Sequence, residues 1–397
     1  MQLIDNEKET HIIPFFRLAF RPFFLGGSLF SIVALSIWGG FLSEGWPITF
    51  YTNPFWWHTH EMLFGFGGAI VVGFLLTAVQ TWTGIPGVRG WQLACLFLLW
   101  LTARLGMLLI REPTEWLATM DIVWLPASAM MLAYPVLKVK MWRNLLFVPL
   151  LLLMALVNGQ MHYAAFQGDH VLAMQAADSG LLLITVLMLV LGGRVIPFFT
   201  SVRLGFPQPE RLSWLELSAL IPVVFVLLVT MSQGSINSDL VVVMLFVAGA
   251  ANTWRFWRWQ PWLTLQEPLL WSLHLSYACI VAGLLLLALT PIIGWSNAIA
   301  LHVLAIGGMG GLILAMICRV TLGHTGRPMQ LPGKAVGFAL GLPVLSALLR
   351  SVLPELAPDL RVNFHVISIL LWILAYGTFL VFYSHMLLQK RVDGKPG

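Results

Sequence analysis

Charged residues are scarce in this chain of 397 residues, because Asp, Glu, Lys and Arg together make up only 10% of it. Soluble globular domains carry about 25% charged residues, so a water-soluble globular fold is excluded. Intrinsic disorder requires low hydrophobicity and high charge, whereas this chain is 59% hydrophobic. There are three cysteines, an odd number, and no Cys-x-x-Cys pair. This pattern excludes a secreted disulfide scaffold and a cysteine metal site.

The chain is instead rich in long apolar runs, such as LLFVPLLLLMALV at 145–157. Strands of a membrane β-barrel would alternate over about 10 residues, whereas a spanning helix needs about 20 apolar residues. The sequence therefore predicts an all-α polytopic membrane protein in which residues 16–389 form one helical domain. Residues 1–15 and 390–397 are expected to be short cytoplasmic segments, and MQLIDNEKET lacks the basic start of a cleaved signal peptide. The twelve expected spans cover about 18–42, 58–80, 91–110, 116–137, 144–164, 171–193, 213–232, 238–256, 267–289, 297–320, 335–353 and 363–388.

The basic residues are sorted to one side of these spans. Of the 22 Lys and Arg residues, all but Arg104, Arg111, Arg350 and Arg361 fall on the side of the termini. The positive-inside rule then makes this side cytoplasmic, so that both termini lie inside the cell. Because the net charge of +5 comes from short clusters between apolar runs, we expect a lipid bilayer and no nucleic acid as partner.

Histidines gather near the opposite, outer side. Several nitrogen ligands that converge in a helical bundle are typical of a metal or haem site, although histidine also favours membrane interfaces for other reasons. Six of the ten histidines lie on this side, on five spans: His58, His60, His162, His170, His302 and His365.

Span 2 carries two of these histidines in the segment WWHTHEMLFGFGG. His58 and His60 are two residues apart and face opposite ways on a helix. Either each serves a different site, or the helix begins between them. Gly67 and Gly68 share the face of His60 and leave either a slot for a porphyrin or a close helix contact. His302, in span 10, is placed to pair with a span-2 histidine around a haem.

Other polar residues within the spans are also candidates. Asn158 and His162 share one face of span 5, and His274 and Tyr277 share one face of span 9; each pair serves either ligation or helix packing. Arg104 in span 3 is expected to pair with Asp121 or with a haem propionate. Intramembrane carboxylates are costly, which makes Glu61 and Asp178 candidate proton relays. A second polar group, explained either by function or by basic anchoring, lies on the inner side: Arg194, Arg319, His324 and Arg327.

Several segments resemble the NnrS family over nearly the whole chain. They are FRLAFRPFFL (16–25), WWHTHEMLFGFGGAIVVGFLLTAVQTWTG (56–84), GGRVIPFFT (192–200), LHVLAIGGMGGLILAMICRVTLGHTGR (301–327) and the closing RVDGKPG. The resemblance implies an inner-membrane protein with b-type haem and copper, linked to nitric oxide metabolism, denitrification and resistance to nitrosative stress. By this resemblance, the motif at 56–84 assigns functional roles to His58, His60 and Glu61. The motif at 301–327 assigns them to His302, Arg319, His324 and Arg327.

These arguments leave open which histidine holds haem and which holds copper. The candidate haem ligands are His58, His60, His162, His274 and His302, with Arg104 beside a propionate. The candidate metal ligands are His58, His60, His162, His302 and His324.

A further likeness is architectural. The catalytic subunit of haem-copper oxidases and nitric oxide reductases also has twelve spans and uses histidines of spans 2 and 10 for a haem. Span 7 of this chain, LSWLELSALIPVVFVLLVTMS, has no histidine. That departure argues against the family's binuclear centre and against oxygen reduction.

Three functions are therefore compared. The leading hypothesis is a membrane haem and copper protein that handles nitric oxide or nitrosyl-metal species by binding, electron transfer or reduction, with an unidentified electron donor. A proton-coupled small-solute transporter is the first alternative, although the two halves show no convincing repeat. An assembly factor that delivers haem or copper is the second. Whether the protein is catalytic stays open at this stage.

Overall fold

The computed structural model describes residues 11–43, 46 and 48–395, and within these residues all regular secondary structure is helical, without a β-strand. Twelve helical segments are long and apolar enough to cross a membrane, which confirms the all-α, twelve-span prediction. Several spans are built from more than one helix. In chain order the spans are α2 (Phe20–Leu42); α3 (Pro54–His60), the π-helix η2 (Glu61–Gly67) and α4 (Gly68–Thr83); α5 (Trp91–Leu109); α6 (Glu115–Lys138); α7 (Trp142–Leu145) with α8 (Phe147–Gln167); α9 (His170–Leu204); α10 (Ser213–Met231); α11 (Asp239–Arg258); α12 (Pro268–Ile293); α13 (Asn297–His302), the π-helix η4 (Val303–Gly310) and α14 (Gly311–His324); α15 (Lys334–Ala339), α16 (Leu342–Arg350) and α17 (Leu353–Leu356); and η5 (Pro358–Leu360) with α18 (Arg361–Leu388).

The second span is fixed at both ends by local chemistry. The Asn53 side chain accepts a hydrogen bond from the Trp56 N–H at 2.9 Å, and Pro54 occupies the first turn, where no N–H is needed. The span ends at Gly84, which adopts φ = 69° and donates its N–H to the Gln80 carbonyl. A residue with a side chain would be strained in that left-handed conformation. These signals place the two histidines of α3 in the first two turns of the span.

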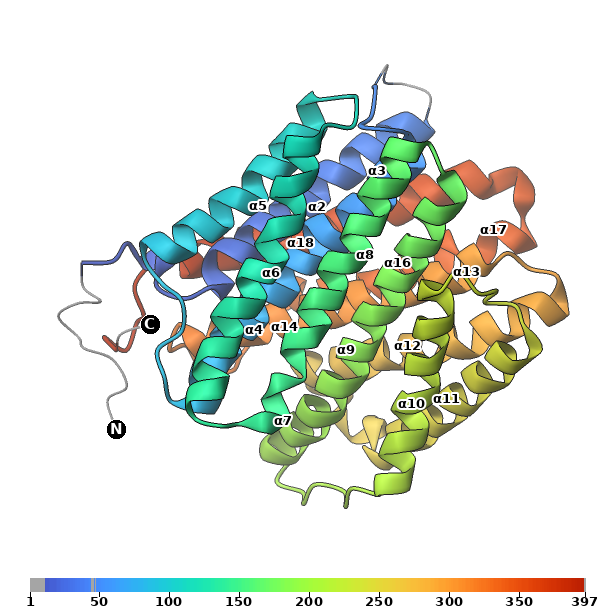
Figure 1. The fold of residues 1–397 in the computed structure, drawn as a ribbon. Helices are drawn as coiled ribbons and strands as arrows, with labels where there is room; N and C mark the ends of the chain where they lie inside the picture. The colour runs from blue at the N-terminus through green and yellow to red at the C-terminus, as the bar shows by residue number, and fades with distance from the viewer. Residues whose placement is uncertain (1–10, 44–45, 47, 396–397) are drawn as a thin grey trace.

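Three spans form the centre of the bundle. In spans 2, 6 and 10, 83%, 78% and 72% of the most apolar window is buried, against 56% or less in each of the other nine. These central spans are four apart in the chain. The helices that join one group of four spans to the next also pack together: α6 with α8, α11 with α12, and α18 with α2, which closes the bundle (Figure 1). The twelve spans are thus arranged as three groups of four, and each group contributes one span to the central trio.

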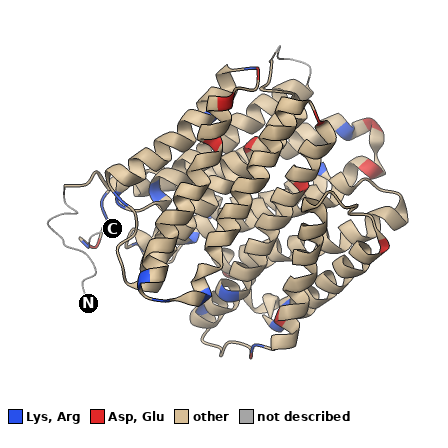
Figure 2. Ribbon diagram, viewed as in Figure 1, with Lys and Arg blue, Asp and Glu red and all other residues tan. Residues whose placement is uncertain are grey.

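The two ends of the bundle differ in charge. Lys and Arg gather mainly along the lower-left end of Figure 2, whereas Asp and Glu lie mainly toward the upper right. Spans 1 and 12 meet at the basic end, where the Arg21 guanidinium donates hydrogen bonds to the carbonyls of Leu387 at 2.9 Å and Gln389 at 2.7 Å. One role of the Arg-rich motif FRLAFRP is therefore to tie the start of the bundle to its end. Below, the outer end means the end opposite this basic end.

Candidate metal centre

A π-helix follows the histidine-bearing helix in both span 2 and span 10. His58 and His60 both lie in the seven-residue helix α3, and the π-helix η2 begins directly after His60. Span 10 repeats this arrangement, because the π-helix η4 begins directly after His302. π-helices are rare and occur frequently at functional sites, because the extra residue redirects side chains. The irregular backbone follows the histidine in the two spans that the sequence had singled out.

His60 lies at the heart of a buried polar network. Its Nδ1 is 2.9 Å from Oε1 of Glu61, and its Nε2 is 2.8 Å from Oδ1 of Asn158 and 3.0 Å from Oδ2 of Asp121. The same Asp121 oxygen is 3.0 Å from Nε2 of His162. Two imidazole nitrogens and one carboxylate oxygen from spans 2, 4 and 5 thus lie within 4.8 Å of one another. We call His60, Asp121 and His162 the metal-centre triad.

Arg104 of span 3 holds the two carboxylates of this network. Its Nη1 donates to Oε1 of Glu61 at 2.7 Å, and its Nη2 forms an ion pair with Oδ1 of Asp121. All four of His60, Glu61, Arg104 and Asp121 have side chains with no exposed surface. Gly65 makes room for this contact, because a Cβ there would lie 2.9 Å from Arg104 Nη1 and 2.6 Å from the Phe30 ring. The expected partnership of Arg104 with Asp121 is present, and Glu61 joins it.

Aromatic side chains cover the triad. The Trp56 indole stacks on the His60 ring with centroids 4.4 Å apart and planes 8° apart, while its Nε1 donates to the Met161 carbonyl at 2.9 Å. Tyr51 approaches the His162 ring at 6.3 Å from the loop before α3. Burial raises the pKa of Tyr51 to about 12. The phenol therefore stays protonated at physiological pH, and this cover excludes water without adding charge.

The hydrogen bonds of the network determine where its protons lie. The Asn158 Nδ2 donates to the Asp121 carbonyl at 3.0 Å and to its carboxylate at 2.8 Å, so Asn158 Oδ1 faces His60 as an acceptor. Both ring nitrogens of His60 thus face acceptors, which is the pattern of a doubly protonated imidazolium. With neutral histidines, two carboxylates and one guanidinium leave one negative charge uncompensated. The network therefore needs one more cation, either a proton on His60 or a metal ion.

Some atoms of the network have no hydrogen bond. Among the described residues, no partner is found for Glu61 Oε2, Arg104 Nε or His162 Nδ1, although each is buried. Buried polar atoms are almost always paired, so unpaired ones call for an explanation such as a ligand or a water. This network therefore contains buried polar atoms that could still bind a ligand, a water molecule or a metal ion.

A second histidine cluster lies nearby at the outer end. We define it as His58, His302, His365 and Arg350. His58 stacks on Trp38 of span 1 with centroids 4.3 Å apart and planes 11° apart, and its Nδ1 is buried without a hydrogen bond in the part of the chain that is described. Arg350 and the rings of His58 and His365 lie close enough to His302 to disfavour a positive charge on its ring. Its Nδ1 is 2.6 Å from the Ala298 carbonyl, which can only accept, so the neutral ring keeps a free lone pair on Nε2.

Residues 14–391 match the model of the protein family described as NnrS protein. The chain belongs to the NnrS family. The match covers nearly the whole chain and confirms the resemblance carried by its motifs. A comparison with curated proteins gives no match. Membership of the NnrS family links the protein to nitric oxide-related function.

Within the described residues, the other candidate residues of this NnrS family member make no hydrogen bond or ion pair with either histidine cluster. Asp178 sits on α9, and within residues 11–43, 46 and 48–395 no hydrogen bond or ion pair joins it to Glu61. His274 lies on α12, where its Nδ1 is 3.1 Å from the Leu270 carbonyl. Tyr277, also on α12, donates to Asn252 at 2.5 Å. The shared helix face of His274 and Tyr277 therefore does not bring His274 to the outer histidines.

The four candidates at the basic end make separate contacts. Arg194 donates to Oδ1 of Asn144 at 3.4 Å, and the Arg319 guanidinium lies 3.8 Å from the centre of the Phe199 ring. The His324 ring lies 5.6 Å from the Phe20 ring, and Arg327 follows the end of α14. Within the described residues, these contacts pack helices together at the basic end and do not form one ligand set.

Two functional residues were underestimated from the sequence. Asp121 was expected only as a partner of Arg104, yet its carboxylate joins both histidines of the triad. The available signal was a lone acid inside the apolar run EWLATMDIVWL. Gly65 had no assigned role, and a Cβ there would lie 2.6 Å from the Phe30 ring and 2.9 Å from Arg104 Nη1, which explains why a side chain is absent.

Proposed function

We propose that this NnrS family protein binds nitric oxide or nitrosyl-metal species at a buried metal centre and handles them by binding or redox chemistry. The observation that carries the proposal is the metal-centre triad, in which His60, Asp121 and His162 converge from three spans without exposure to water. The missing positive charge of the network supports a resident cation. A metal there would supply an open coordination position and a change of oxidation state.

Copper is the metal that we propose for the triad. Imidazole suits copper, and a carboxylate completes a set of three ligands that leaves room for a small exogenous ligand. Glu61 accepts from Nδ1 of His60 at 2.9 Å and would orient the ring and raise its basicity while Nε2 binds the metal. Arg104 fixes both carboxylates, and Trp56 with Tyr51 keeps water out. Each residue around the triad thus has a task that a metal site requires.

For haem we propose His58 and His302 of the second histidine cluster as ligands. The free Nε2 of His302 and the unpaired Nδ1 of His58 are the atoms that would hold the haem iron, and Arg350 would supply positive charge for a propionate. The chain lacks the Cys-x-x-Cys-His motif of covalent attachment, so we expect a b-type haem. A haem held by these residues would supply one-electron redox chemistry, for which the electron donor is unidentified. We also propose that the basic end faces the cytoplasm of a bacterial inner membrane, by the positive-inside rule.

The test is metal analysis and spectroscopy of the detergent-purified protein. We expect copper and haem in the wild type, loss of copper in His162→Ala and Asp121→Asn, and loss of haem in His302→Ala. His385→Ala serves as the control, since His385 is exposed at the basic end. We expect the optical spectrum to change on addition of nitric oxide.

Three results would replace this proposal. Full copper content in both His162→Ala and Asp121→Asn would remove the triad as the metal site. A wild type that contains neither copper nor haem, but whose solute uptake depends on Asp178, would favour the transporter alternative. Metal that exchanges freely with a chelator, without any turnover of nitric oxide, would favour the assembly factor.

A further inference from the structure

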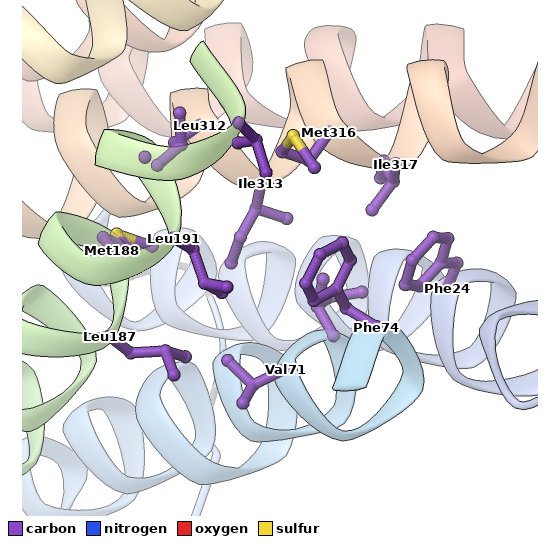
Figure 3. A pocket seen from close by; sticks show the side chains of 13 residues that line it. Phe24, Val71, Phe74, Leu187, Met188, Leu191, Leu312, Ile313, Met316 and Ile317 are labelled. Carbon is purple, nitrogen blue, oxygen red and sulfur yellow. The ribbon is translucent and has the colours of Figure 1, made fainter. Parts of the chain in front are cut away.

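An apolar cavity lies where the three central spans meet. It holds about 60 Å³, and helices α4, α9 and α14 surround it together with α2 (Figure 3). All of its lining residues have side chains without nitrogen or oxygen. Six that the figure labels are Phe24, Val71, Phe74, Leu191, Ile313 and Met316.

The size and lining of the cavity select its ligand. A cavity needs roughly 10–15 Å³ to hold one water-sized molecule, and apolar cavities stay dry yet take up apolar guests such as xenon. An ion or a polar metabolite would find no hydrogen-bond partner on these walls. Large side chains from three helices surround this space without filling it. Because an unfilled cavity lowers the stability of a fold, its presence calls for a function. The ligand class that fits is a small uncharged gas.

The cavity and the metal-centre triad both border span 2, and the cavity lies closer to the basic end of the bundle. Val71 follows Glu61 by ten residues along span 2, which is at most about 15 Å at the rise of an α-helix. One apolar layer lies between them. A Cβ on Gly67 would be 3.3 Å from the Met309 sulfur and 3.4 Å from Cδ1 of Ile184, so the bare backbone of Gly67 lets spans 6 and 10 meet on span 2. Above this layer, the Phe64 ring lies 5.3 Å from the His60 ring.

We propose that this cavity binds nitric oxide as a dissolved gas and delivers it past Gly67 to the metal-centre triad. The choice of nitric oxide rests on the proposed function, whereas the capacity to bind a small apolar gas rests on the cavity alone. Because every side chain from Val71 to Phe64 along this route is apolar, an uncharged diatomic molecule meets no polar barrier. Water and protons are kept from the centre on the same side.

The first experiment uses xenon as the probe. Crystals of the full-length protein are pressurised with xenon, and anomalous density is measured for the wild type, Val71→Phe and Leu228→Phe. Val71 lines the cavity, while Leu228 is 56% exposed on α10 and receives the same kind of enlargement on the lipid-facing surface. We expect xenon in the wild type and in Leu228→Phe and none in Val71→Phe. A wild-type crystal without xenon in this cavity, or with a lipid chain in it, overturns the proposal even if Val71→Phe fails to fold.

The second experiment follows nitric oxide itself. The rate of nitric oxide association with the purified metal-loaded protein is measured by flash photolysis, and we expect it to fall about tenfold in Val71→Phe, within the range over which association rates vary among variants of one site. Gly67→Ala is expected to act in the same direction, and Leu228→Phe is expected to match the wild type. A wild-type rate in Val71→Phe after xenon has been lost overturns the delivery route. If the wild-type spectrum does not respond to nitric oxide at all, the proposed function fails, while xenon occupancy still supports a gas cavity.

Discussion

Two buried polar networks hold this bundle, and they differ in whether they are complete. In the inner network, around Arg255 of span 8, Arg255 makes two bonds to the Glu216 carboxylate, at 3.1 and 2.7 Å, and one each to the Leu189 carbonyl and the Tyr277 hydroxyl at 3.1 Å. Tyr277 donates in turn to Asn252. One cation meets one anion, and within the described residues none of these four polar side chains has a buried atom without a partner.

The network of the metal centre is incomplete by the same measures. It has two carboxylates for one guanidinium, and buried atoms of Glu61, Arg104 and His162 have no hydrogen bond in the described part of the chain. Satisfied networks rigidify a fold, whereas partly satisfied ones cost free energy unless something else completes them. The inner network is therefore a clamp on spans 6 to 9, whereas we propose that the outer one is a site. Substitutions in the two networks should consequently have different effects.

The largest difference is expected when each network loses its arginine. Arg104→Met leaves Glu61 and Asp121 buried without a counter-charge, and breaking a buried ion pair costs about 3–5 kcal/mol. Arg255→Met should cost less, about 1–3 kcal/mol, because the Glu216 side chain is 38% exposed and can be hydrated. Unfolding free energies in mixed detergent micelles measure both. Equal losses of unfolding free energy in Arg104→Met and Arg255→Met would contradict the conclusion that the outer network is more deeply buried and has an excess negative charge.

The next effect concerns metal content. His162→Ala should lower the copper affinity at least on the order of 100-fold, since loss of a ligand exceeds the 10–100-fold cost of losing an outer-shell partner. Tyr277→Phe should leave the affinity unchanged, because the inner network has no vacant charge. Competition with a copper chelator measures both proteins. A matching loss in Tyr277→Phe would mean that the whole bundle, and not the triad, controls binding.

A glycine test follows from the packing of the outer network. Gly65→Ala forces Arg104 or Phe30 to shift, since a Cβ would lie 2.9 Å from Arg104 Nη1, and overpacking costs about 1–3 kcal/mol. Gly159→Ala is the matched control, because a Cβ there meets only the Ile122 side chain at an ordinary 3.8 Å. The unfolding temperature and the copper content should both fall in Gly65→Ala and stay unchanged in Gly159→Ala. A stable Gly65→Ala protein with full copper content would show that Arg104 does not depend on this close approach.

The pH dependence of metal binding should separate the networks further. Metal at Nε2 of His60 displaces the proton that this nitrogen donates in the metal-free network, so copper affinity should fall as the pH falls. Release of one proton per metal predicts about a tenfold loss of affinity per pH unit. Copper titrations at pH 6, 7 and 8 provide the measurement. A flat profile would mean that His60 is already neutral, and that the missing cation is supplied in another way.

The sequence predicts the spans and the charge sorting because both follow from hydropathy along the chain. It also placed His58 and His60 on opposite sides of one helix, since helical periodicity alone sets that angle. It could not predict which spans become neighbours. His60 meets Asp121 and His162 because spans 2, 4 and 5 pack together, and this packing depends on the whole bundle.

The π-helices explain a second limit. An extra residue per turn after His60 and after His302 changes which later side chains share a face, and regular helical periodicity does not anticipate it. The stripe of glycines in each of these segments was visible in the sequence. Its consequence was not, because Gly65 admits Arg104 and Gly67 admits Met309 and Ile184 only in the folded bundle.

The smallest expected effect tests the inner network as a clamp. Tyr277→Phe removes one hydroxyl that both accepts from Arg255 and donates to Asn252, while Arg255 keeps its bonds to Glu216 and Leu189. Loss of one such hydrogen bond costs about 1 kcal/mol. The unfolding free energy should drop by this amount, with copper, haem and the response to nitric oxide intact. A loss of cofactor together with so small a loss of stability would show that the inner network communicates with the outer one. The division between clamp and site would then have to be abandoned.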